Sequence, residues 1–153
     1  MLNRLLPAQI DNRYRGHKLA LWLLYPITFL NLVIDLVSIF SADGGAQSAD
    51  GIPLDTFSAA AARAVVGVAA YLGLADLVLV VFSVLALVRY RAMVPLIYLV
   101  IVIEFLAHKG IGLMKPIART GDTHGGLVTL GLFALSVLGL VLSLTGRDQA
   151  REA

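Results

Sequence analysis

The chain has 153 residues, of which 59% are hydrophobic and 14% are charged, and its mean hydropathy is +0.86. Because soluble domains are only about 45–50% apolar, this composition excludes an ordinary soluble domain and indicates a membrane protein. Cysteine is absent and the net charge is only +2, which excludes thiol catalysis, disulfides and cysteine-held metals and argues against a nucleic acid as a partner.

Four apolar stretches are long enough to cross a bilayer, which takes about 20 residues each. They are residues 20–40, 65–88, 92–113 and 127–145. The first stretch is longer than the apolar part of a signal peptide, about 7–15 residues, and no typical cleavage site follows Phe40. We therefore expect an all-α integral membrane protein in which residues 1–153 form a single domain, a four-transmembrane-helix antiparallel bundle.

The basic residues lie mainly on one side of the expected bundle. Eight of the twelve Lys and Arg residues flank the spans on that side: Arg4, Arg13, Arg15, Lys18, Arg89, Arg91, Arg147 and Arg151. Cytoplasmic segments carry the excess of Lys and Arg, so this asymmetry predicts cytoplasmic N and C termini and non-cytoplasmic loops at residues 41–56 and 114–126. We expect the protein in an inner (plasma) membrane of the bacterial type.

The first loop contains three acidic residues, Asp43, Asp50 and Asp55. Their spacing does not resemble that of an EF-hand, and Asp-Gly pairs are typical of turns. We therefore interpret the loop as a series of turns and not as a calcium site. Asp55 or Thr56 is expected to cap the second helix, because a short polar side chain can accept a hydrogen bond from an N–H of the first turn.

Each span carries its polar or small residues three, four or seven positions apart, which places them on one face of a helix. The first three sets are Thr28, Asn31, Asp35 and Ser38; Gly73, Asp76 and Ser83; and Glu104, His108 and Gly112. The fourth set is Thr129, Ser136, Gly139 and Ser143. We expect these faces to point into the bundle, and the fourth to be a packing surface because small residues let helices approach closely.

The ionisable residues of the spans are expected at two depths. Asn31, Asp76 and Glu104 each lie thirteen residues from a basic residue at the cytoplasmic edge, or roughly 20 Å at about 1.5 Å per residue. Asp35 and His108 lie seventeen residues from theirs, one helical turn further out. Spans two and three are joined by a tight turn at Tyr90, so Asp76 and Glu104 are expected to meet.

The candidate site for a proton or a small ligand consists of Asp76, Glu104, His108, Asp35 and Asn31. Two carboxyl groups that meet in a low-dielectric bundle cannot both stay ionised. Ionisable groups inside a membrane are functional by default, because they are costly to place there. This pattern favours proton or small-ligand binding in a transport or accessory role, with no cofactor.

Other interpretations remain open at the level of sequence. Glu104, His108, Asp35 and Asp76 could hold a metal, although bundle di-metal sites usually present a Glu-x-x-His motif twice; we assign no metal ligand and no catalytic residue. A membrane enzyme with a Glu/His/Asp site is less favoured than a non-enzyme. The acids could also serve only to hold helices together, for example Asp35 paired with Lys109.

The expected partners are the lipid bilayer and other membrane-embedded chains. A single four-span bundle offers little internal space once its polar faces are packed. We therefore expect a homo-oligomer or a complex with another membrane protein. The main alternative to a transport role is accordingly a non-catalytic partner or assembly subunit of a larger membrane complex.

Overall fold

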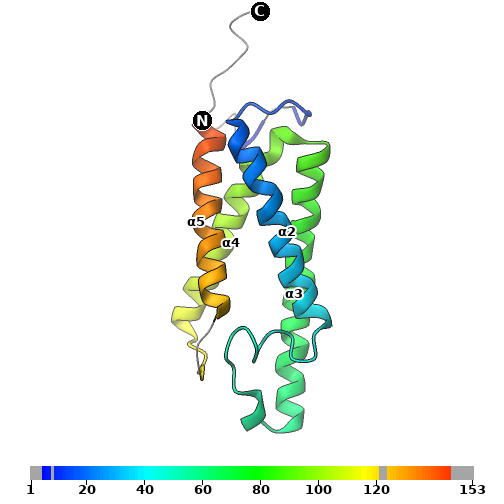
Figure 1. Ribbon diagram of the computed structural model, residues 1–153, viewed down its shortest axis with the longest axis vertical. Coiled ribbons are helices and arrows are strands. Elements are labelled where there is room, and N and C mark those ends of the chain that lie inside the picture. The colour runs from blue at the N-terminus through cyan, green and yellow to red at the C-terminus, as the bar shows by residue number, and fades with distance from the viewer. Residues whose placement is uncertain (1–4, 8, 121–123, 146–153) are drawn as a thin grey trace, which may run out of the picture.

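The computed structural model describes residues 5–7, 9–120 and 124–145 of the chain. Its long elements are four helices, α2 (Lys18–Phe40), α3 (Ala59–Val88), α4 (Val94–Met114) and α5 (His124–Thr145). Each of the four is long and apolar enough to cross a membrane (Figure 1). The expected all-α chain with four membrane-length helices is thus confirmed. Of the residues used to orient it, Arg4, Arg147, Arg151 and part of the loop at 114–126 lie outside the described residues.

Two short 3-10 turns precede helices within the described part of the chain, η1 (Leu54–Thr56) before α3 and η2 (Arg91–Met93) before α4. The prediction that Asp55 or Thr56 caps α3 is wrong. Ser58 caps the helix, because its hydroxyl accepts a hydrogen bond from Ala61 N at 3.3 Å. Asp55 and Thr56 are held in η1 instead, where the Thr56 hydroxyl donates to the Pro53 carbonyl at 2.8 Å.

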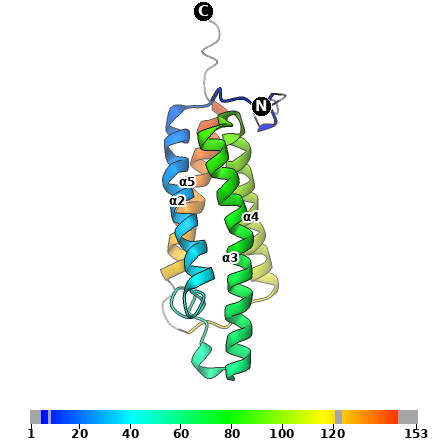
Figure 2. The ribbon, with the colours of Figure 1, turned by 90° about the vertical axis from the view of Figure 1, so that its right-hand side faces the viewer.

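The four helices lie side by side along their length (Figures 1 and 2). α2 packs against α3 on one side and α5 on the other, and α5 packs against α4. α3 and α4 follow each other through η2 but contact each other much less than the other neighbouring pairs do. The bundle is therefore tighter around α2 and α5 than between α3 and α4.

At one end of the bundle, here called the basic end, α2 begins, η2 connects α3 to α4, and α5 ends (Figure 1). Backbone hydrogen bonds tie these segments together. His17 N donates to Leu142 O at 3.2 Å, and Ala92 N donates to Asp11 O at 3.2 Å. The residues that precede α2 thus hold the ends of α4 and α5 in place.

At the opposite end, here called the loop end, residues 41–58 connect α2 to α3. This connection is held by hydrogen bonds within it, and Gly44 and Gly45 have φ values of 60° and 73°, which favour glycine. Two further bonds reach the other helix pair: Gly125 N donates to Ala49 O at 3.2 Å and Thr120 N donates to Gly51 O at 2.8 Å. The loop therefore joins the α2–α3 pair to the α4–α5 pair.

The apolar core lies mainly toward the basic end. Its buried members are Ala20, Leu24, Ile27, Ala86, Leu87, Val94, Ile97, Tyr98, Ile101 and Leu132. The Tyr98 hydroxyl donates to the Ala20 carbonyl at 2.6 Å, and Gly139 leaves no space for a Cβ because the Tyr98 ring lies against it. Ser136 and Ser143 are also fully buried, as expected of a packing face on α5, whereas Thr129 is exposed.

Candidate functional site

Three carboxyl groups from three different helices lie close together inside the membrane-length segments. They belong to Asp35 in the last turns of α2, Asp76 near the middle of α3 and Glu104 near the middle of α4. Asp76 and Glu104 interact electrostatically with each other, and Asp35 interacts electrostatically with both. We call these residues the acid trio.

Gly73 brings α2 and α3 together beside the acid trio. It lies one turn before Asp76, and a Cβ at this position would lie 2.7 Å from the Ser38 Cβ and 3.0 Å from the Asp35 carbonyl oxygen. Such distances are too short for an ordinary side chain, so the close approach of the two backbones depends on glycine. This approach places Asp35 near Asp76.

The members of the trio differ in burial. Asp35 is 4% exposed, and its Oδ2 atom is buried without a hydrogen-bond partner among the described residues. Asp76 and Glu104 are half-buried, on the side where α3 and α4 make little contact. The trio thus has an enclosed member on α2 and a more accessible pair on α3 and α4.

No basic side chain of the described residues pairs with the trio. The ion pair recorded in this part of the chain joins Arg15 to Asp11 at 3.4 Å, at the basic end. Lys109, considered as a partner of Asp35, is exposed, and its Nζ lies 5.6 Å from the centre of the Phe105 ring. The interpretation of Asp35 and Lys109 as a structural pair therefore has no support in the geometry.

His108 and Asn31, the other two candidate residues, lie apart from this cluster. The His108 side chain is exposed and makes no hydrogen bond or ion pair with any described residue. A step of four residues rotates about 40° around a helix and advances about 6 Å along it, so lying on the same general face as Glu104, one turn further out, does not place His108 beside it. Asn31 is half-buried on α2, one turn from Asp35 toward the basic end.

The geometry also bears on the metal interpretation. Among the described residues, no three His, Asp or Glu side chains are arranged so that they could hold a metal ion. Transition metals in bundles need such a set of converging ligands. The carboxyl groups of the trio therefore interact with one another without forming a metal-binding geometry.

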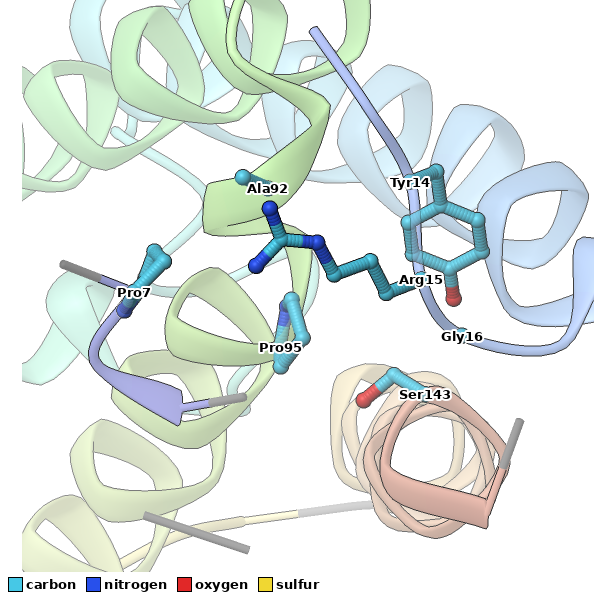
Figure 3. Close-up of a pocket in the computed structure, with 7 residues that line it drawn as sticks. All are labelled: Pro7, Tyr14, Arg15, Gly16, Ala92, Pro95 and Ser143. Atoms are coloured by element: carbon cyan, nitrogen blue, oxygen red, sulfur yellow. The ribbon is translucent and has the colours of Figure 1, made fainter. Parts of the chain in front are cut away.

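A small cavity at the basic end was not foreseen from the sequence (Figure 3). It is lined by Pro7, Tyr14, Arg15, Gly16, Ala92, Pro95 and Ser143 and has a volume of about 10 Å³. This is about the space of one water molecule, so the cavity is too small for a substrate. Burial raises the pKa of Tyr14 to about 12, which keeps this phenol neutral.

Comparison with known proteins adds no family to these observations. No protein-family model matches the chain, and no similar curated protein and no similar solved structure was found. Function therefore has to be argued from the acid trio and its surroundings.

Proposed function

We propose that the chain is a small multi-pass protein that binds and releases protons at Asp35, Asp76 and Glu104, in a transport or accessory role. The observation that carries this proposal is the convergence of three carboxyl groups from three helices with no basic partner among the described residues. The proposed setting is an inner (plasma) membrane of the bacterial type.

The proposed topology is an antiparallel bundle with both termini in the cytoplasm. The basic end carries Arg13, Arg15, Lys18, Arg89 and Arg91, whereas the loop end and its helix termini carry Arg63, Lys115 and Arg119. An excess of Lys and Arg marks the cytoplasmic side. This distribution supports placing the basic end in the cytoplasm.

Proton binding accounts for the acids better than a purely structural role does. A single carboxylate at the centre of a bilayer costs about 2.5–3.5 kcal/mol on insertion scales, and three neighbouring ones repel one another as well. Polar contacts between membrane helices return only about 0.6 kcal/mol on average. A proton held between Asp76 and Glu104 removes one charge and supplies the hydrogen bond that two carboxylates lack.

A role as partner or assembly subunit is the second candidate, and the exposure of the pair favours it. Asp76 and Glu104 are half-buried where α3 and α4 make little contact. Facing lipid is unfavourable for a carboxyl group, so a second copy of the chain or another membrane protein packed there would cover the pair. Association and proton binding are compatible, because a cover over the pair would also control its access to protons.

The test is a comparison of protonated carboxyl groups in the purified protein and in the double variant Asp76→Asn, Glu104→Gln. Infrared difference spectra recorded on lowering the pH are expected to show a carboxylic C=O band from the trio, and the double variant is expected to lose most of it. Asp55→Asn, in the loop end, serves as the matched control and should keep the band. An unchanged band in a folded double variant would refute proton binding at the pair.

A further inference from the structure

The acid trio contains a buried acceptor for which the described part of the chain supplies no donor. Asp35 is 4% exposed, yet its Oδ2 has no hydrogen-bond partner among the described residues. A buried polar atom left unpaired costs about 1–3 kcal/mol, and more if it is charged, so most such atoms in proteins are paired. A buried acceptor that interacts electrostatically with two other carboxyl groups therefore points to a donor that the described residues do not supply.

The charges around this acceptor define the donor as a cation. Even with one proton between Asp76 and Glu104, the three carboxyl groups retain negative charge when Asp35 is ionised, and no described basic residue pairs with them. α5 adds no ionisable side chain between Gly125 and Thr145, and His108 and Lys109 of α4 are exposed. A cation is the complement of such a site.

The same site favours an N–H donor over a metal ion. The described residues offer no set of three ligands for a metal, whereas ionised carboxyl oxygens accept strong hydrogen bonds from ammonium N–H groups. An ammonium group has three such donors. One could reach Asp35 and the others the pair on α3 and α4.

The surroundings of the accessible pair are apolar. Ile103 and Leu106, which flank Glu104 on α4, are each 55% exposed, and the neighbouring faces of α3 are equally rich in exposed aliphatic residues. A ligand that enters between α3 and α4 must therefore cross an apolar, lipid-facing surface. A cation with an attached apolar group fits this route, because its apolar part stays favourable there.

We propose that the acid trio binds a primary ammonium cation that carries an apolar group, with N–H donation to Asp35 and to the pair formed by Asp76 and Glu104. This inference rests on the proposed function, because the ammonium ion takes the place of the proton shared by the pair. Binding of one ammonium ion then releases up to one proton to solution, and lowering the pH weakens the binding. The net change is exchange of one cation for another, with no covalent step.

The test uses 2-phenylethylammonium as the probe and isothermal titration calorimetry of the full chain in detergent. We expect saturable binding, with proton release that is seen as a dependence of the heat on the ionisation enthalpy of the buffer. Asp35→Asn preserves the shape of the side chain and should weaken binding at least tenfold. Asp50→Asn, an exposed acid of the loop end, should bind as the unchanged protein does. Glu104→Gln provides a second weakened variant if Asp35→Asn fails to fold.

A matched probe separates N–H recognition from simple attraction of an apolar cation. 2-Phenylethyltrimethylammonium has the same charge and ring but no N–H donor, so it should bind at least tenfold more weakly. Equal binding of the two probes, or equal binding by folded Asp35→Asn, would overturn the inference.

If the infrared band is lost in the Asp76→Asn, Glu104→Gln variant while neither probe binds the unchanged protein, the proton site stands and the ammonium site does not. If the band persists in that variant while Asp35→Asn abolishes ammonium binding, proton binding at the pair is the proposal that fails.

Discussion

The half of the bundle toward the basic end and the half toward the loop end differ in how tightly they are packed. Toward the basic end, Leu24, Ile27 and Tyr98 are fully buried, and backbone hydrogen bonds from the segment before α2 tie α4 and α5 to it. Toward the loop end, Asp76 and Glu104 are only half-buried, and one oxygen of Asp35 has no hydrogen-bond partner in the described part of the chain. The half toward the basic end therefore supplies most of the packing stability, whereas the half toward the loop end contains buried carboxyl groups and looser packing, as is common where stability is given up for a function.

The largest expected effect is a loss of stability in the half toward the basic end, caused by a substitution at Gly139. Gly139→Leu places a side chain where the Tyr98 ring already lies, and overpacking of this kind costs about 3 kcal/mol or more. Thermal unfolding in detergent, followed by circular dichroism, should show a large drop in Tm. Gly131→Leu, on the same helix with open space around it, is the control and should leave Tm nearly unchanged. A similar drop in Tm in both variants would show that the half toward the basic end does not supply most of the stability.

A smaller effect is expected at Gly73, on which both the packing of α2 against α3 and the geometry of the acid trio depend. Gly73→Ala should push α3 away from Ser38 and Asp35 and cost about 1–3 kcal/mol. It should also weaken the protonated carboxyl band and the binding of 2-phenylethylammonium, because Asp35 moves away from Asp76. Gly67→Ala lies on the same helix with nothing within 4 Å of the added Cβ, and should be neutral or stabilise α3 by up to about 1 kcal/mol. Normal binding by Gly73→Ala would show that the site does not depend on this close approach.

The membrane-length helices could be predicted because their signal is strong and local. Runs of about 20 apolar residues specify a helix in a bilayer almost regardless of its neighbours. The proximity of Asp76 and Glu104 also follows from a local feature, the tight turn at Tyr90, which sets the two helices at equal distances from a common point. Neither conclusion requires knowledge of how the remaining helices pack.

The surroundings of the trio could not be predicted by the same means. Counting residues gives neither the shift of one helix along another nor the rotation of a helix about its axis, so it predicts Asp35 one turn away from Asp76 and His108 beside Asp35. The contact at Gly73 shows why: the crossing of α2 and α3 depends on where a side chain is missing. The burial of Tyr98 is a second example, because its fit against Gly139 depends on two helices that are distant in sequence.

The smallest expected effect is at Asp43, in the connection at the loop end, and it depends on pH. Its carboxylate accepts hydrogen bonds from Ser48 N at 2.8 Å, Gly45 N at 3.1 Å and the Ser41 hydroxyl at 3.2 Å. These bonds hold the pKa of Asp43 well below its ordinary value of 3.8. A carboxyl group with a lowered pKa in the folded state stabilises that state fully above the ordinary value, and its contribution is lost as the pH falls below 3.8 toward the lowered pKa.

Asp43→Asn should therefore loosen the connection at neutral pH by about 0.5–1 kcal/mol, since charged hydrogen bonds are weakened by solvent at this half-buried site. Amide hydrogen exchange at Ser48 and Gly45 should be faster in the variant at pH 5–7, relative to the Asp50→Asn control. The difference should shrink progressively as the pH falls below 3.8 toward the lowered pKa, because protonation then increasingly favours the opened connection. A difference that persists undiminished at the lowest pH would contradict a role for the charge. If Asp43→Asn also alters ammonium binding at the trio, the connection and the site act as one unit, because Gly44 of the same connection packs against Ser38 and Ala69 of the helices that carry Asp35 and Asp76.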